Sequence, residues 1–98
     1  MNPAQSRLAP LRHFVVAMTE LVQSGADERE SLATGRRLLE PLLQDDAWLL
    51  PPWSKPRSDS YSQYLLHCDP LQRFSVVSFV WGPGQATPVH NHGVWGLV

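Results

Sequence analysis

Two histidines near the end of the sequence are the residues best suited to do chemistry. His90 and His92 are separated by one residue in the stretch GPGQATPVHNHGVWGLV. In a β-strand, residues two apart point to the same face and lie roughly 6 to 7 Å apart along the chain. Two imidazoles placed in this way can bind one metal ion as neighbouring ligands, with nitrogen-to-metal distances of about 2 Å. Pairs of ordinary histidines have the same spacing, so these two residues alone leave both interpretations open.

The other reactive side chains are interpreted as structural or exposed. His13 falls within a predicted helix, and Asp45 and Asp46 near a helix end are expected to be solvated. His67 and Cys68 are neighbours in a predicted strand and therefore point to opposite faces, which argues against a nucleophile and its base. We expect Cys68 to be a buried small hydrophobic residue.

An apolar stripe predicts a first helix. Apolar side chains recur every three or four positions from Leu8 to Val22, as they do on one face of an amphipathic helix. The stretch SGAD that follows supplies a glycine at which the helix can stop, and its last residue, Asp27, can cap the next helix.

A second helix is predicted from about Glu28 to Gln44, with five leucines on its apolar side. Gly35 and Pro41 weaken this prediction, because each lowers the stability of a helix interior. We expect a kink or an early end near Glu40.

The second half of the chain predicts strands. Residues 51–60 contain three prolines and no periodicity, which is typical of a linker. The segments YSQYLLHC and QRFSVVSFVW are rich in β-branched and aromatic residues and flank the turn sequence DPL, so they predict a β-hairpin.

One face of the second strand would carry Phe74, Val76, Ser78 and Val80, and the other Val77 and Phe79. Because both faces are largely apolar, we expect cover on both sides. A third strand is predicted at 89–92 and a fourth within 94–98.

These elements predict an α+β fold with a helical segment at 1–50, a linker at 51–60 and a β segment at 61–98. The charge of the chain is close to neutral, with eight basic and nine acidic residues, so we expect neither nucleic acid nor an anionic membrane as a partner. No apolar run is long enough to span a bilayer, and no secretory signal is recognisable. The single cysteine excludes an internal disulfide and favours a reducing, cytoplasmic location.

The context of the histidine pair carries a family resemblance. Gly84 stands six residues before His90, giving G-x5-H-x-H, which resembles the first metal motif of the cupin superfamily. Most metal-binding cupins have a glutamate where this chain has Gly96 or Leu97. The longer stretch QYLLHCDPLQRFSVVSFVWGPGQATPVHNHGVWGLV resembles the cupins that lack this glutamate, the bacterial thiol dioxygenases: cysteine dioxygenase-like proteins and 3-mercaptopropionate dioxygenases.

The resemblance implies an enzyme that binds Fe(II) through three histidines and uses O2 to oxidise a small thiol carboxylate, cysteine or 3-mercaptopropionate, to its sulfinic acid. His90 and His92 would be two of the iron ligands, and Gln63 would receive the substrate carboxylate. A glutamine at this place is typical of enzymes that favour 3-mercaptopropionate, and it offers weaker, neutral hydrogen bonds than an arginine. Trp81 and Trp95 could line the pocket, although strand tryptophans are more often core residues.

Several positions depart from the family pattern. Asn91 and Gly93 stand where relatives commonly have aspartate and arginine, and Gly96 falls where mammalian relatives carry a cross-linked cysteine, so no cross-link is expected. The third histidine ligand would come from later strands. The resemblance therefore predicts the first part of a truncated cupin barrel, inactive as it stands, and leaves the oligomeric state open. The alternative is a non-catalytic cupin-like protein that binds a small molecule or a metal.

Overall fold

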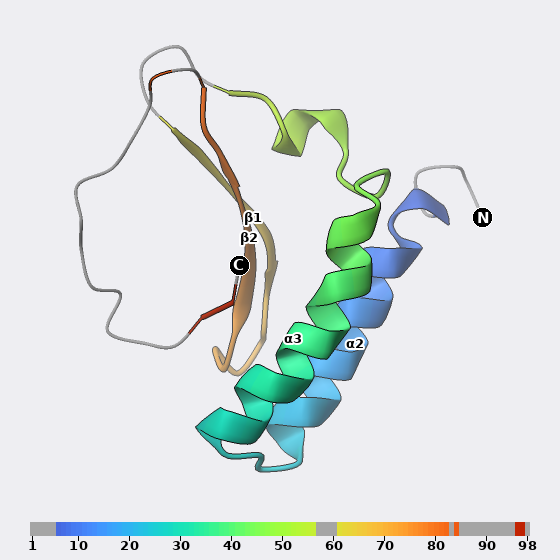
Figure 1. The fold of residues 1–98 in the computed structure, drawn as a ribbon, viewed down its shortest axis with the longest axis vertical. Helices are drawn as coiled ribbons and strands as arrows, with labels where there is room; N and C mark the ends of the chain where they lie inside the picture. The colour runs from blue at the N-terminus through green and yellow to red at the C-terminus, as the bar shows by residue number, and fades with distance from the viewer. Residues whose placement is uncertain (1–5, 57–60, 83, 85–95, 98) are drawn as a thin grey trace. The chain divides into compact units, whose positions relative to one another are not determined.

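The computed structural model describes residues 6–56, 61–82, 84 and 96–97 of the 98-residue chain. Two helices precede a pair of antiparallel strands, which confirms the predicted α+β class (Figure 1). The elements are α2 (Ala9–Gln23), α3 (Glu28–Gln44), the short 3₁₀ helix η1 (Pro51–Trp53), β1 (Ser62–Cys68) and β2 (Ser75–Val80). The described residues form two units, a helical unit of residues 6–48 with 96–97 and a hairpin unit of residues 49–56, 61–82 and 84.

Not all predicted strands can be compared with the structure. The predicted third strand at 89–92 lies outside the described residues. Of the predicted fourth strand only Gly96 and Leu97 are described, and neither lies in a helix or a strand. The cupin barrel therefore stays a prediction.

The first helix follows the predicted stripe. Pro10 lies in its first turn, where a missing N–H breaks no helical hydrogen bond, and Leu11, Met18 and Leu21 are buried. The helix ends as the sequence predicts, because Gly25 adopts a φ of 76° that L-residues rarely adopt.

The second helix has the predicted bounds and the predicted cap. The Asp27 carboxylate accepts a hydrogen bond from the backbone N–H of Glu30 at 2.8 Å. Of the expected kink or early end near Glu40, the early end is wrong, since α3 continues through Pro41 to Gln44, and the kink stays a prediction. The last turn is stabilised because Leu42 is buried and its carbonyl accepts a hydrogen bond from Trp48 Nε1 at 2.9 Å. Helices α2 and α3 pack side by side (Figure 1).

The two strands form the predicted hairpin, with one irregularity in their register that the sequence does not predict. Gln63 pairs with Phe79 and Leu65 with Val77, but His67 pairs with Val76, so Leu66 is an extra residue in a β-bulge. The bulge reverses the side-chain alternation beyond it, and Cys68 comes to lie on the exposed side of the hairpin. The prediction that Cys68 is buried is therefore wrong.

One face of the hairpin is covered by the segment that precedes it. Ser78 Oγ donates a hydrogen bond to the carbonyl of Trp53 at 3.0 Å, and Tyr64 Oη donates to the carbonyl of Lys55 at 2.7 Å. The opposite face, here called the open face, is exposed among the described residues of the hairpin unit, since Leu65 is 64% exposed, and Phe79 and Trp81 are each 47% exposed. Within the hairpin unit, the described residues cover one face only, and the expected cover of the second face stays a prediction.

The turn between the strands is fixed by its own hydrogen bonds. The backbone N–H of Gln72 donates to the carbonyl of Asp69 at 2.8 Å, and the N–H of Asp69 donates to the carbonyl of Phe74 at 3.0 Å. Gln72 has a φ of 59°, in the left-handed region that tight turns require. The Asp69 side chain is buried in this turn and ion-paired with Arg73.

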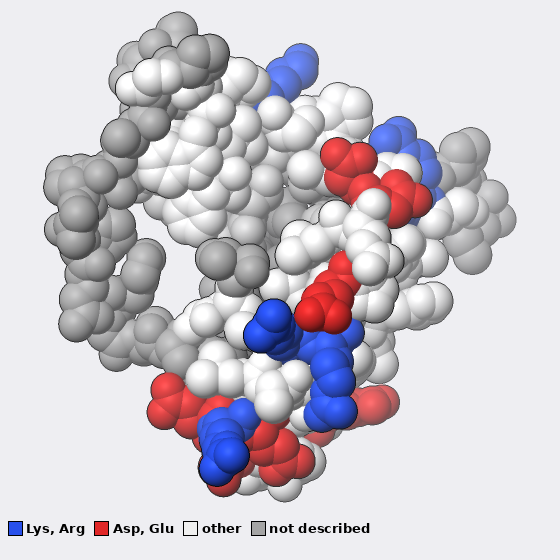
Figure 2. All heavy atoms as spheres, viewed as in Figure 1, with Lys and Arg blue, Asp and Glu red and all other residues white. Residues whose placement is uncertain are grey.

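Charged side chains of both signs lie close together on the face drawn in Figure 2. The overall charge of the chain is −1. On α3, for example, Arg36 and Glu40 form an exposed ion pair at 3.4 Å. Among the described residues, no helix has the length and apolar character needed to cross a membrane.

Candidate functional site

The predicted site residues fall into two groups. Gln63 and Trp81 belong to the hairpin and are described. The predicted iron ligands His90 and His92, and the possible pocket residue Trp95, lie outside the described residues. The geometry available is therefore that of the predicted carboxylate-binding residue and its neighbours.

The hairpin register places Gln63 on the open face. Its partner across the strands is Phe79, and the pairing of Ser62 with Val80 brings Tyr61 and Trp81 opposite each other at the open end of the hairpin. Because side chains alternate along a strand, Tyr61 and Gln63 share a face with Phe79 and Trp81.

A hydrogen bond fixes the end of the Gln63 side chain. Gln63 Nε2 donates to Tyr61 Oη at 3.1 Å. The amide nitrogen carries two hydrogens, so one N–H is used in this bond and the second remains available to a ligand. Gln63 itself is exposed, and a ligand on this face can reach its amide.

Two aromatic rings hold Tyr61 in turn. The ring of Trp81 is stacked on it with centroids 4.8 Å apart and planes 23° apart. Phe79 makes a tilted contact, with centroids at 6.2 Å and planes at 31°. Both distances fall in the favourable range for aromatic pairs, each of which contributes about 0.5–1.5 kcal/mol beyond the burial of its area.

The open face of the hairpin is uncharged over its described residues. Its side chains are Tyr61, Gln63, Leu65, Cys68, Ser75, Val77, Phe79 and Trp81. A carboxylate bound here would meet neutral donors and no guanidinium or ammonium group of this face. The apolar side chains could contact the carbon chain of a small ligand.

Tyr61 was not singled out by sequence reasoning. The signal that could have found it is its spacing, two residues before Gln63 in a predicted strand and therefore on the same face. The stacking with Trp81 depends on the hairpin register, which the position of the turn sequence DPL only approximates.

The other titratable side chains of the hairpin form no metal-binding group with one another or with the rest of the described residues. Across the described part of the chain, no group of three His, Cys, Asp or Glu residues could hold a metal ion. His67 contacts the ring of Phe74 at 5.6 Å, and its Nε2 is buried with no hydrogen-bond partner among the described residues. Its surroundings agree with the structural role expected for His67.

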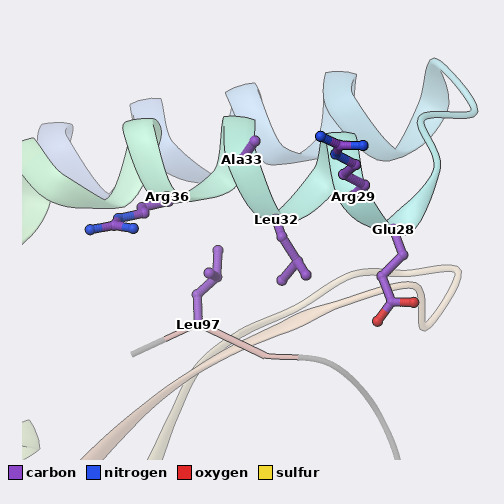
Figure 3. Close-up of a pocket in the computed structure, with 6 residues that line it drawn as sticks. All are labelled: Glu28, Arg29, Leu32, Ala33, Arg36 and Leu97. Carbon is purple, nitrogen blue, oxygen red and sulfur yellow. The ribbon is translucent and has the colours of Figure 1, made fainter.

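A surface hollow lies on the helical unit. It is lined by Glu28, Arg29, Leu32, Ala33, Arg36 and Leu97. The side chains of Leu32 and Leu97 point into the same space (Figure 3). Leu97 reaches α3 closely at Gly35, where an added Cβ would lie 2.8 Å from Leu97 Cδ1. The contacts described in this hollow are therefore apolar ones, between Leu97 and helix α3.

Comparison with known protein families adds no assignment. No protein-family model matches the chain. The resemblance to thiol dioxygenases therefore depends on the residues of this sequence alone.

Proposed function

We propose that this chain carries the carboxylate-binding glutamine and two of the metal ligands of an Fe(II)-dependent thiol dioxygenase. The observation that carries the proposal is the Gln63 amide, which Tyr61 holds at 3.1 Å on an uncharged, aromatic face of the hairpin. The hairpin would form the first two strands of a cupin barrel, and the H-x-H pair of His90 and His92 supports the metal site from the sequence.

The chemistry of the open face favours 3-mercaptopropionate over cysteine. The second N–H of Gln63 can donate to the substrate carboxylate, and apolar neighbours such as Phe79 suit its methylene groups. Cysteine also carries an ammonium group, for which the described residues of this face offer no carboxylate. Desolvating that charge without a partner would weaken cysteine binding.

The donor set of the histidine pair fits iron. Imidazole nitrogens are good ligands for this metal, and His90 and His92 would supply two of them. Bound Fe(II) would supply the redox chemistry that allows O2 to react with a thiol. In the overall reaction RSH + O2 → RSO2⁻ + H⁺, two S–O bonds form, the O–O bond breaks, sulfur is oxidised and the thiol proton goes to solvent.

Iron retention and product formation test the proposal together. The chain, together with the later strands that the resemblance implies as the source of the third histidine ligand, is loaded with Fe(II) under anaerobic conditions, freed of excess metal, and mixed with 3-mercaptopropionate and O2. We expect bound iron and a sulfinate that mass spectrometry detects. Replacement of His90 or His92 by alanine should abolish both. The matched control is His13→Ala, because His13 is exposed on α2. Equal iron retention in the His90 and His13 variants would contradict the assignment.

The alternative is a non-catalytic cupin-like protein that binds a metal or a small molecule. Asn91 and Gly93 favour it, since they remove charged groups that relatives place beside the metal. Iron and thiol binding without sulfinate would support this alternative.

We propose a reducing, cytoplasmic setting for this activity. Cys68, the single cysteine, is an exposed thiol with no disulfide partner in the sequence. A small thiol substrate would also remain reduced there.

A further inference from the structure

We infer that Trp81 is a positioning residue, which stacks on Tyr61 and thereby orients the Gln63 amide toward the substrate carboxylate. The inference rests on the proposed function for the identity of the ligand. Its structural part, the dependence of Gln63 on Trp81, stands on the hairpin geometry alone.

The first step is the stack between Trp81 and Tyr61. The two residues flank the paired strands, one position before β1 and one after β2, where the ladder of backbone hydrogen bonds ends. The ring centroids lie 4.8 Å apart at an interplanar angle of 23°. Trp81 is 47% exposed, so its indole covers the tyrosine ring without being deeply buried itself.

The second step is the hydrogen bond from Gln63 to Tyr61. A glutamine side chain has three rotatable bonds, and an exposed one moves among many rotamers. The 3.1 Å bond from Gln63 Nε2 to Tyr61 Oη removes much of this freedom. The position of this hydrogen bond depends on the position of the Tyr61 ring, because that ring carries the accepting hydroxyl. Trp81 stacks on the same ring.

Ligand binding would depend on both contacts, the stack of Trp81 on Tyr61 and the hydrogen bond from Gln63 to Tyr61. A preorganised amide loses little conformational entropy when it binds a carboxylate, whereas a mobile one loses most of its rotamer freedom at that moment. Removal of the Trp81 ring should therefore weaken carboxylate binding by about tenfold, the scale set by the ordering of one long side chain. Trp81 does not have to touch the substrate for this effect.

A nuclear magnetic resonance measurement tests the structural part. The side-chain NH2 resonances of Gln63, assigned by their loss in Gln63→Leu, report the mobility of the amide through ¹⁵N relaxation. We expect an ordered amide in the wild-type protein, a mobile one in Trp81→Leu, and recovery in Trp81→Phe, which keeps a ring. Leu65→Ala is the matched control, because it removes another exposed apolar side chain from the same face.

Kinetics test the functional part. With 3-mercaptopropionate, Trp81→Leu should raise KM by about tenfold and leave kcat nearly unchanged. With 2-mercaptoethanol, which has no carboxylate, KM should be the same in both proteins. A general loss of structure would instead raise KM for both substrates and lower the unfolding temperature of the protein.

The results distinguish a failure of this inference about Trp81 from a failure of the proposed function. An equally ordered Gln63 amide in the wild-type protein and in Trp81→Leu would overturn the inference, whatever the activity. If the amide becomes mobile as expected but the wild-type protein forms no sulfinate, the dependence of Gln63 on Trp81 is supported and the proposed function is wrong. A KM increase of the same size for both thiols would overturn the role of Trp81 in carboxylate binding.

Discussion

The guanidinium of Arg73 holds the carboxylate of Asp69 through two hydrogen bonds inside the turn between β1 and β2. Arg73 Nε lies 2.8 Å from Asp69 Oδ2, and Nη2 lies 3.1 Å from Oδ1. The backbone N–H of Arg73 also donates to Oδ2 at 3.1 Å. The side-chain hydrogen bond from Arg73 is the main reason that the pKa of Asp69 is lowered from 3.8 to about 2, against the opposing effect of burial. The turn is therefore tied together by a charged pair.

This pair predicts a specific dependence of stability on pH. Because the pKa of Asp69 is lower in the folded state, its contribution to the free energy of unfolding is complete above about pH 3.8 and is lost as the pH falls through about 2. Urea denaturation between pH 5 and 2 should show this loss in the wild-type protein and a smaller one in Asp69→Asn.

The control for this experiment is Asp46→Asn, since Asp46 is exposed beyond the end of α3. It should keep the pH dependence of the wild-type protein. The same pH dependence in Asp69→Asn and the wild-type protein would show that the pair does not stabilise the fold.

The contact between Gly35 and Leu97 predicts coupled effects on stability. Alanine is favoured over glycine in a helix interior by about 1 kcal/mol, so Gly35→Ala should stabilise α3. The new Cβ would lie 2.8 Å from Leu97 Cδ1, however, and the leucine must move. We expect a gain of less than about 1 kcal/mol in the wild-type protein and the full gain in a Leu97→Ala background.

A double-mutant cycle with urea denaturation measures this coupling. Identical effects of Gly35→Ala in the two backgrounds would mean that Leu97 does not pack against α3.

Replacing each of two serines on the covered face of the hairpin by alanine should change the stability of the protein, with opposite signs. Ser62 is 4% exposed, and its Oγ has no hydrogen-bond partner among the described residues. Ser78 Oγ donates to the carbonyl of Trp53 at 3.0 Å. Ser62→Ala should therefore stabilise the protein by about 1 kcal/mol, and Ser78→Ala should destabilise it by about as much. Chemical denaturation checks both, and a loss of stability in each variant would contradict this account of Ser62.

The elements with local signals could be predicted from the sequence. The bounds of α3 follow from its leucine pattern and from Asp27 at its cap, and the turn sequence DPL marks the hairpin. The effect of Pro41 could not be read locally, because the turn that contains it is stabilised by the hydrogen bond from Trp48 to the Leu42 carbonyl. Tertiary contacts of this kind override helix propensity.

The position of Cys68 shows a different limit of sequence reasoning. Strict alternation places Cys68 on the same face as Ser62, but the extra residue Leu66 shifts the register by one and turns the thiol outward. Nothing in the residue types of this segment marks a bulge. In the candidate site, Gln63 was found through family resemblance, whereas its tether to Tyr61 required the structure.

The most direct test of the central claim is the KM for 3-mercaptopropionate, with sulfinate formation as the readout, in Gln63→Ala and in Gln44→Ala. Gln44 is an exposed glutamine at the end of α3 and serves as the matched control. The account predicts about a tenfold higher KM in Gln63→Ala, from the loss of the neutral hydrogen bond to the carboxylate, and no change in Gln44→Ala. The same KM in both variants, or no sulfinate from the wild-type protein, would contradict the claim that Gln63 places the carboxylate of a thiol substrate.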